Sequence, residues 1–184
     1  MARSTARKRA LNTLYEADEK GQDILSLLAE RLEHPGAQTP LPDYAVEIIQ
    51  GVAQHKKDID HLLGECSTRW KVSRMPVVDR NIMRIAVWEI VYNDEVPAGV
   101  SIDEALGLAK TLCDSDSPNF IYGVLTAARE QAENMATQQA AQAEESQEVA
   151  DEHASEVGSD AEQVSGETTE NAAEAIENTE KTND

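Results

Sequence analysis

Three helix starts lie within residues 75–125, and apolar residues at helical spacing follow each of them. Pro76 suits the first position of a helix, because its missing N–H would have no partner there. Ser101 with Glu104 three residues later is typical of a capping box, which satisfies two backbone donors. Ser117, with proline directly after it, repeats the start signal. This punctuation predicts three consecutive helices.

The apolar positions behind these starts show which faces are buried. The first segment is apolar on several faces, which predicts a central helix covered on more than one side. The second and third segments each carry a one-sided stripe. The positions are Val78, Ile82, Met83, Ile85, Val87, Trp88, Ile90 and Val91; then Ile102, Ala105, Leu106, Ala109 and Leu112; then Phe120, Ile121, Val124, Leu125 and Ala128.

Four further helices are predicted before residue 75. The first runs from about Thr5 and ends at Gly21, Asp23 caps the second, the third follows Pro42, and Asp58 caps the fourth. Their inward residues are Ala10, Leu11, Leu14 and Tyr15; Ile24, Leu27, Leu28 and Leu32; Val46, Ile49 and Val52; and Ile59, Leu62, Leu63, Cys66 and Trp70. Residues 34–42, rich in proline, form a loop. Seven helices with short connections predict an all-α fold of helical bundles.

Charge and composition divide the chain. Residues 1–130 hold 15 Lys and Arg against 20 Asp and Glu, a net charge of −5, whereas residues 131–184 hold one Lys and 15 Asp and Glu, a net charge of −14. The second part has no aromatic residue and no proline. Such a segment buries too little apolar surface to offset the entropy of ordering. We expect a folded domain over 1–131 and a disordered, low-complexity acidic tail over 132–184, with the last helix continuing to about residue 145.

Several function classes find no support in the sequence. Cys66 and Cys113 stand alone and fit buried, reduced thiols. No segment has the length of a signal peptide or a membrane span, which predicts a cytoplasmic protein without a membrane partner. His55 and His61 lie six residues apart and cannot share one helix face, and Asp58 between them serves better as a cap, so no metal site is expected. We find no catalytic motif, and expect neither catalytic residues nor a cofactor.

An ordered set of short motifs resembles the NusB family of bacterial transcription antitermination factors. The pieces are residues 76–80 (PVVDR) with 82–84 (IMR), Glu89, 96–97 (VP), 102–105 (IDEA), 108–110 (LAK), Phe120 and 123–125 (GVL), preceded by the basic start at 6–11 (ARKRAL). No single piece is specific, but their order and spacing are. The resemblance covers about residues 3–131. The chain departs from the family at Tyr122 and Asp103, where the family usually has Asn.

The resemblance implies a fold of two packed helical bundles and a non-enzymatic function. Family members bind single-stranded boxA-type RNA together with NusE, a small-subunit ribosomal protein. They join the elongating RNA polymerase with other Nus factors and suppress termination in ribosomal RNA operons. Members occur as monomers or as dimers, and the sequence leaves a homodimer open.

Candidate RNA-binding residues lie in two places. Arg3, Arg7, Lys8 and Arg9 form a basic arm suited to phosphate oxygens, although such a helix start is also typical of a solvated terminus. Phe120 fits either the core or a stacking platform for an unpaired base. The resemblance favours RNA contact by the arm and by the start of the last helix. The full set is Arg3, Arg7, Lys8, Arg9, Tyr15, Asp116, Ser117, Phe120 and Tyr122.

Four charged residues lie in the apolar central helix: Asp79, Arg80, Arg84 and Glu89. Buried charges require partners, so a paired structural network is the first interpretation. The resemblance offers a second role, as part of a face on the C-terminal bundle that docks NusE.

Two other functions stay open. A helical adaptor with protein partners alone would not depend on Arg7, Lys8 and Arg9. A NusB-like domain also occurs in some RNA cytosine methyltransferases, where a catalytic domain follows it. The acidic, cysteine-free residues after 131 do not fit such a domain, so that interpretation requires the chain to be a fragment. The acidic tail could also cover the basic arm and weaken nonspecific RNA binding.

Overall fold

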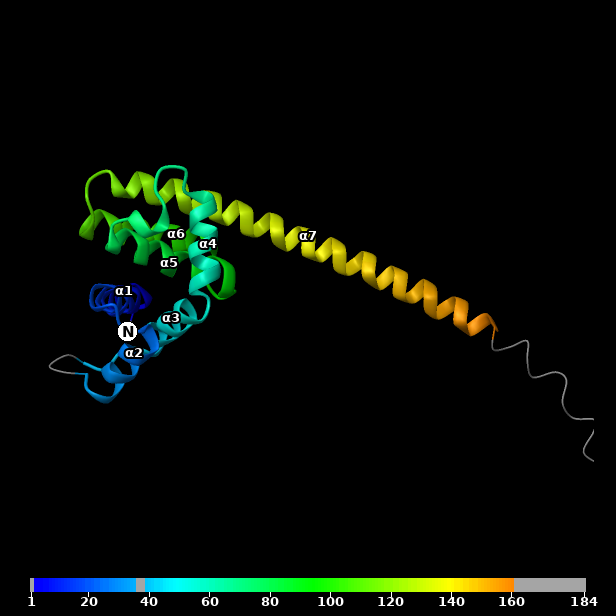
Figure 1. Cartoon of the computed structure of the whole chain (residues 1–184), viewed down its shortest axis with the longest axis horizontal. Helices are drawn as coiled ribbons and strands as arrows, with labels where there is room; N and C mark the ends of the chain where they lie inside the picture. The colour runs from blue at the N-terminus through cyan, green and yellow to red at the C-terminus, as the bar shows by residue number, and fades with distance from the viewer. Residues whose placement is uncertain (1, 36–38, 161–184) are drawn as a thin grey trace, which may run out of the picture. The chain divides into compact units, whose positions relative to one another are not determined.

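The structure, a computed structural model, describes residues 2–35 and 39–160, with side chains to residue 143. Seven α-helices and one short 3₁₀ turn make up the described chain, without a strand (Figure 1). They are α1 (Arg3–Lys20), α2 (Ile24–Glu33), α3 (Asp43–Gln54), α4 (Lys56–Cys66), η1 (Val72–Arg74), α5 (Val77–Tyr92), α6 (Ala98–Leu112) and α7 (Ser117–Asp160). The predicted all-α fold of about seven helices is confirmed.

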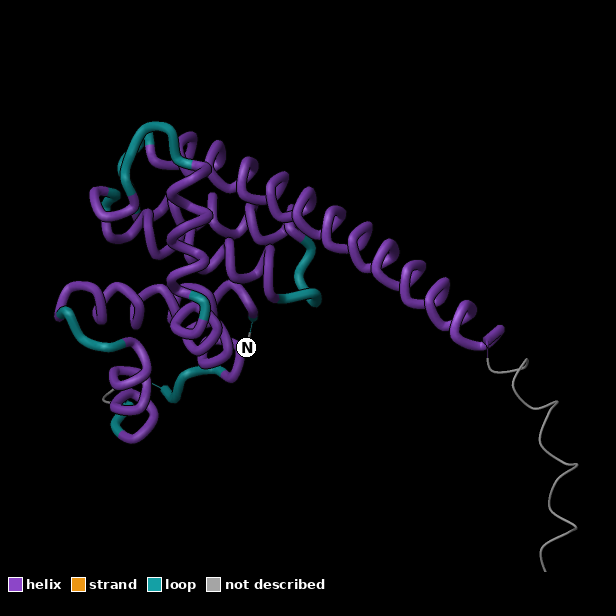
Figure 2. Tube along the Cα trace, turned by 45° about the vertical axis from the view of Figure 1, so that its right-hand side comes forward, coloured by secondary structure: helices purple, strands orange, loops and turns teal. Residues whose placement is uncertain are grey.

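The helices of the first half pack against those of the second half through α5. Helices α1, α2 and α3 contact one another, α5 and α6 form a pair, and α5 also contacts α1, α3 and α4 (Figure 2). Every residue of α5 from Asn81 to Glu89 is buried. The prediction of a central helix covered on several sides is therefore confirmed, and α5 is the element to which the other helices are fixed.

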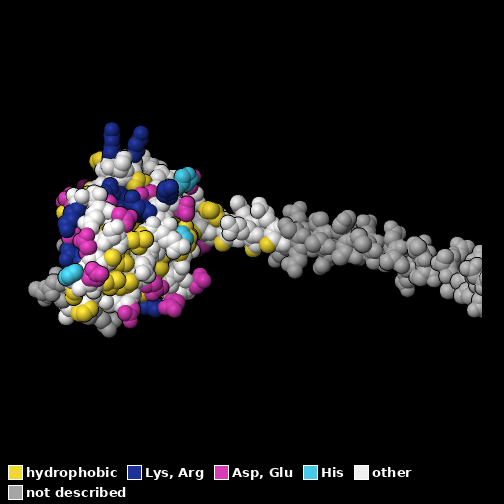
Figure 3. Space-filling view, turned by 60° about the horizontal axis from the view of Figure 1, so that its bottom comes forward, with side chains coloured by type: hydrophobic (Ala, Val, Ile, Leu, Met, Phe, Trp, Pro, Cys, Tyr) yellow, Lys and Arg dark blue, Asp and Glu magenta, His cyan; other side chains and the backbone are white. Residues whose placement is uncertain are grey.

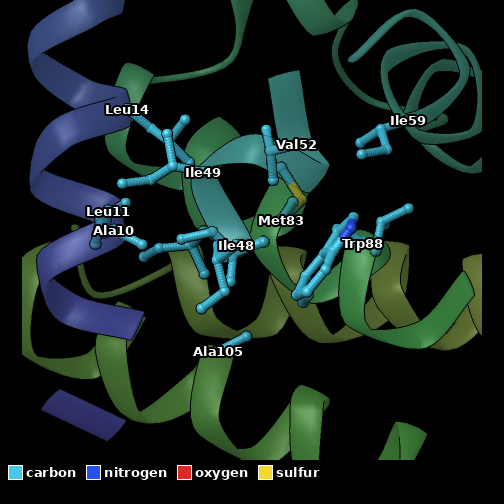
Figure 4. Packing of buried hydrophobic residues seen from close by; sticks show 14 of the residues in the cluster. Ala10, Leu11, Leu14, Ile48, Ile49, Val52, Ile59, Met83, Trp88 and Ala105 are labelled. Carbon is cyan, nitrogen blue, oxygen red and sulfur yellow. The ribbon is translucent and has the colours of Figure 1, made fainter. Parts of the chain in front are cut away.

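One hydrophobic core serves both halves. Leu11 and Leu14 of α1 lie against Ile48 and Ile49 of α3, with Met83 and Trp88 of α5 beyond them (Figure 4). The first part of α7 adds Ile121, Val124, Leu125 and Ala128, as its stripe predicts. Each fully buried Leu or Ile contributes about 1.5–3 kcal/mol relative to exposure.

The chain divides into two units, residues 1–135 and 136–184. Helix α7 does not end at about residue 145, as expected, but continues to Asp160. Residues 124–157 contain neither Gly nor Pro and are rich in Ala, Glu and Gln, which are strong helix formers. This propensity outweighs the low apolar content over that stretch. Residues 161–184 of the predicted tail lie outside the described residues.

Local start and stop signals are only partly followed. Asp23 caps α2 as predicted, because its Oδ1 accepts a hydrogen bond from the backbone N–H of Ser26 at 2.9 Å. Gly21 ends α1 with a φ of 59°, a left-handed conformation that favours glycine. The prediction that Asp58 caps the fourth helix is wrong. Helix α4 begins two residues earlier, at Lys56, so Asp58 lies in its first turn.

Two other start predictions are also displaced. Pro76 is the residue before α5 rather than its first residue. Helix α6 starts at Ala98 after Pro97, so Ser101 lies inside the helix and caps nothing. The hydroxyl of Ser101 instead donates to Glu89. The predicted capping box at Ser101 and Glu104 is therefore wrong, because the Ser101 hydroxyl bonds to Glu89 of α5 instead of to the start of its own helix.

Five residues predicted to be buried are substantially exposed. They are Tyr15 (41%), Leu32 (52%), Trp70 (43%), Val91 (37%) and Leu112 (40%). Trp70 lies outside α4, which ends at Cys66, so the helical stripe does not reach it. No helix among the described ranges is long and apolar enough to cross a membrane.

Helices α3 and α5 approach closely at Gly51. A Cβ at this position would lie 1.9 Å from Nε1 and 2.2 Å from Cε2 of Trp88. We expect Gly51→Ala to lower the free energy of unfolding by about 1–3 kcal/mol, because the buried indole has to move. Urea unfolding followed by circular dichroism measures the change.

Gly107→Ala is the matched control for this substitution. Gly107 also lies inside a helix, but a Cβ added there would have no atom within 4 Å. Its replacement should raise stability by up to about 1 kcal/mol, through helix propensity alone. Equal effects of the two substitutions would contradict the close approach of Gly51 to Trp88.

Candidate nucleic-acid interface

A single buried carboxylate joins four helices. Glu89 of α5, 1% exposed, accepts hydrogen bonds from Nε of Arg7 at 2.8 Å and from the hydroxyl of Ser101 at 2.9 Å. The hydroxyl of Tyr44 in α3 donates to it as well. Glu104 of α6 lies 3.4 Å from Nη1 of Arg7. Burial, together with the hydrogen bond to Glu89, raises the pKa of Tyr44, so its phenol stays protonated as a donor.

This network places the side chain of Arg7 inside the protein. Its side chain is 4% exposed and paired with Glu89, so it is not available to phosphate in this conformation. Glu89 is likewise no surface residue for docking a protein. The pair holds α1 against α5, and the basic arm is part of a regular helix from Arg3 onward.

The other three cations of the basic arm reach the surface in different ways. Arg3 pairs with Glu95 at 2.5 Å and lies over the ring of Tyr44, with both charged groups exposed. Arg9 donates to the backbone carbonyls at Thr39 and Pro40, which ties α1 to the loop before α3. Among the described residues, Lys8 alone of the arm has no ion pair or side-chain hydrogen bond.

Lys8 lines a hollow between α1 and α6. Ser4 and Thr5 border it on the α1 side, and Val100, Asp103, Glu104, Gly107 and Leu108 border it on the α6 side. Asp103 is one of the two positions that depart from the family pattern. A carboxylate beside Lys8 weakens the attraction of this hollow for phosphate.

A second charged network fixes α1 and α4 to the start of α5. Asp18 accepts hydrogen bonds from Arg80, Asn81 and Arg84, at 2.9 to 3.0 Å. Arg84 also forms a two-pronged contact with Asp60 of α4, at 2.7 and 2.8 Å. Burial alone would raise the pKa of Asp18, but the guanidinium groups of Arg80 and Arg84 and the amide of Asn81 outweigh it, so the pKa is lowered.

The predicted docking residues are therefore internal. Asp79, Arg84 and Glu89 are each at most 4% exposed, and the side chain of Arg80 is 14% exposed. Asp79 lies beside Cys113, and burial together with this carboxylate raises the pKa of that thiol to about 12. The structural interpretation of these four residues agrees with their burial, whereas direct contact with a partner does not.

A second hollow lies where α7 begins beside the end of α4. Its lining includes Thr68 and Arg69 on one side and Asp116, Asn119 and Phe120 on the other, and its volume is about 580 Å³. This lies within the range of roughly 300–1,000 Å³ typical of ligand pockets. Phe120 is half-buried, packed on the core yet facing this hollow. Both interpretations of Phe120, core residue and accessible aromatic face, are therefore compatible with its position.

The remaining predicted RNA contacts differ in exposure. Tyr122 is 54% exposed and Tyr15 41%, so both rings present accessible faces. Ser117 is 8% exposed, at the first turn of α7. The two hollows, one with Lys8 and the other with Phe120, are separate pockets, so the structure does not bring all nine predicted residues into one site.

The sequence patterns do not single out the segment between α4 and α5 as a site, and they predict a core position for Trp70. Arg69, Trp70, Lys71 and Arg74 are all exposed there. The sequence Arg69-Trp70-Lys71, an aromatic residue between two basic ones, is the pattern that could have indicated this segment. Figure 3 shows one face of the protein, on which Lys and Arg side chains project beside exposed hydrophobic ones.

Among the described residues, no group of three or more His, Cys, Asp or Glu side chains could hold a metal ion. Cys66 and Cys113 are free and half-buried, and burial raises the pKa of both thiols.

The fold defines an all-α protein of packed helical bundles, and comparisons with known proteins specify it further. Residues 4–130 match the NusB family. The transcription antitermination protein NusB of Bifidobacterium longum subsp. infantis is 75% identical over 127 residues, which cover 69% of this chain and 68% of that protein. The NusB of Beutenbergia cavernae is 48% identical over 132 residues, covering 67% and 86%.

Solved structures agree with this similarity. Thermotoga maritima NusB superposes with a TM-score of 0.61 at 27% identity, over 71% of this chain and 92% of that one. A NusB chain in a complex of NusB and NusE with double-stranded RNA gives 0.60 at 25% identity, over 71% and 99%. The chain belongs to the NusB family of transcription antitermination factors.

The Arg7–Glu89 pair gives a stability prediction. Glu89→Gln leaves the buried guanidinium of Arg7 with Glu104, 3.4 Å away and partly exposed, as its only remaining carboxylate among the described residues. We therefore expect the free energy of unfolding to fall by about 3 kcal/mol. Chemical denaturation measures it. Glu95→Gln, which removes the exposed partner of Arg3, is the control and should cost at most about 1 kcal/mol. Similar losses in both variants would mean that the buried network does not hold the helices together.

The Asp18 network gives a pH dependence. Because its pKa in the folded protein lies below the ordinary value of 3.8, Asp18 stabilises the fold above that value. This contribution is lost as the pH falls through the lowered pKa. The stability difference between the native protein and Asp18→Asn should therefore be constant above about pH 5 and shrink in acid. A difference that grows as the pH falls would have the wrong sign for a paired carboxylate.

Proposed function

We propose that this protein binds single-stranded boxA-type RNA together with NusE and acts without catalysis. The complex joins elongating RNA polymerase with other Nus factors and suppresses termination in ribosomal RNA operons, in the cytoplasm. Membership of the family is the observation that carries this proposal. The solved NusB–NusE–RNA complex, whose NusB chain shares this fold, supports RNA and NusE as partners.

The surface offers groups suited to RNA at the start of α7. Phe120 presents a ring in a hollow, Tyr122 an exposed ring, and Asp116 a carboxylate able to accept hydrogen bonds from base amino groups. Lys8 and Arg3 on α1 supply exposed cations for phosphates. Tyr15 and Ser117 complete the proposed set, with Arg9 positioning the loop before α3. Arg7 supports this surface from inside rather than contacting RNA.

The C-terminal bundle is the proposed docking region for NusE. Arg80 and Arg84 contribute by fixing α5 against α1 and α4, and Glu89 contributes by fixing it against α1, α3 and α6. Asp79 lies inside the same bundle, beside Cys113. Pre-organisation of this kind lowers the cost of ordering groups on binding. Residues 1–131 suffice for both interactions in this proposal, and the role of residues 132–184 is separate.

Tethering is the proposed mechanism. RNA held by this protein and NusE on the polymerase stays at high effective concentration near the enzyme, without any covalent step. A helical adaptor that binds protein alone is the second candidate. It shares the fold but predicts no preference for RNA sequence. In this proposal, a homodimer would have to leave the start of α7 accessible.

Fluorescence anisotropy with labelled RNA tests the proposal. The full chain with purified NusE should prefer boxA-like RNA over a scrambled RNA, and the preference should be weaker without NusE. Phe120→Leu keeps apolar packing but loses the aromatic face, so affinity should fall about tenfold, since base stacking contributes roughly 1–3 kcal/mol. Phe120→Tyr, the matched control, should bind nearly as the native protein does. Equal binding of both RNAs with or without NusE would favour the adaptor.

A further inference from the structure

The segment between α4 and α5 combines exposed positive charges, an exposed aromatic ring and a backbone held by local hydrogen bonds. Arg69, Lys71 and Arg74 are exposed, and within the described chain none of the three has an ion pair or a side-chain hydrogen bond. Trp70, between the first two, is 43% exposed. We propose that this segment, residues 67–75, is a second RNA-binding element, on which Trp70 stacks an unpaired base and the flanking cations bind phosphates.

The segment is held in place by its own hydrogen bonds. The hydroxyl of Ser67 donates to the carbonyl of Trp70 at 2.7 Å and accepts from the Trp70 backbone N–H at 3.3 Å. The 3₁₀ turn over Val72–Arg74 follows directly. Met75, 3% exposed, anchors the end of the segment in the core. The backbone of Trp70 is therefore tied to Ser67, which reduces the entropy that this segment loses when RNA binds.

Continuity with the start of α7 identifies the occupant. Arg69 and Thr68 form one wall of the hollow that contains Phe120 and Asp116. A strand of RNA whose base lies against Phe120 would place neighbouring phosphates within reach of Arg69. Spaced aromatic rings beside a basic groove are the usual means of holding single strands. A folded protein partner would gain less from three unpaired cations around one exposed ring, because such a surface suits a regularly charged polymer.

The distribution of charge in α1 strengthens this assignment. Arg7 is buried, Arg3 is paired with Glu95, and Arg9 is bound to a loop. The cations of residues 69–74 are free by comparison, so they can release counterions when they meet phosphates. This inference rests on the proposed RNA-binding function and extends the RNA path beyond the residues that the family pattern suggested.

Removal of two positive charges from this segment tests the phosphate contacts, and the same removal at the start of α4 is the control. Arg69→Gln/Lys71→Gln should weaken binding of labelled boxA-like single-stranded RNA by the full chain with NusE about tenfold at moderate salt. The slope of log affinity against log salt should fall by about 1.4, because each phosphate contact on a single strand contributes about 0.7. Lys56→Gln/Lys57→Gln removes the same charge at the N-terminal end of α4, a helix about 16 Å long that ends before Arg69. This control should bind as the native protein does.

Intrinsic fluorescence tests the stacking. The chain has two tryptophans, Trp70 and Trp88, and Trp88 is buried at 5% exposure. RNA should quench the emission of the native protein, and Trp70→Phe should abolish the quenching while binding within a few fold of native. Trp70→Ala should lose affinity about tenfold, by the loss of one stacked base.

The outcomes separate this inference from the function on which it rests. Failure of the native protein to prefer boxA-like RNA would overturn both. A native preference combined with unchanged affinity in Arg69→Gln/Lys71→Gln, or with quenching that persists in Trp70→Phe, would overturn the second element alone. Loss of NusE binding in the charge variant, with RNA binding by the protein alone unchanged, would assign the segment to protein docking instead.

Discussion

The carboxylate of Glu89 is the point on which the architecture depends. It lies in the most buried helix and receives donors from α1, α3 and α6, so one side chain fixes the relative position of four helices. Removal of one partner of a buried ion pair leaves the other charge in a region of low polarity. Arg7 depends on Glu89 all the more because its own Nη2 has no hydrogen-bond partner among the described residues. Glu89 and Arg7 therefore set the geometry of the bundle, and the Asp18 network does the same at the opposite end of α1.

These networks also decide which cations remain for nucleic acid. Arg7 and Arg84 neutralise internal carboxylates, whereas Arg69, Lys71 and Lys8 stay unpaired at the surface of the described chain. A net charge of −19 for the whole chain argues against RNA binding only if charge is averaged over the sequence. The folded domain instead separates buried, compensated charge from exposed, free charge. Its candidate RNA surface is consequently local, around the start of α7 and the segment that precedes α5.

Much of the fold could be predicted because helix periodicity, Asp23 and Gly21 act locally. The buried positions of Arg7 and Ser101 could not be predicted, because Glu89, the partner of both, lies 82 and 12 positions away along the chain. Arg7 fits a solvated terminus as well as a buried pair, and Ser101 fits a cap as well as a buried donor. The spacing of Trp70 predicts a core position because it continues the α4 stripe, but the helix ends before it. Phe120 stays a predicted site residue, which packs on the core and also lines a hollow.

Photocrosslinking tests the central claim most directly: that RNA contacts the free cations and rings near α7 rather than the buried arginine of α1. The full chain with NusE would be crosslinked to 4-thiouridine-containing boxA-like RNA, and the modified peptides identified by mass spectrometry. We predict crosslinks within residues 67–75 and 116–122, and none on Arg7. Crosslinks confined to residues 3–9, with Arg7 among them, would contradict the account.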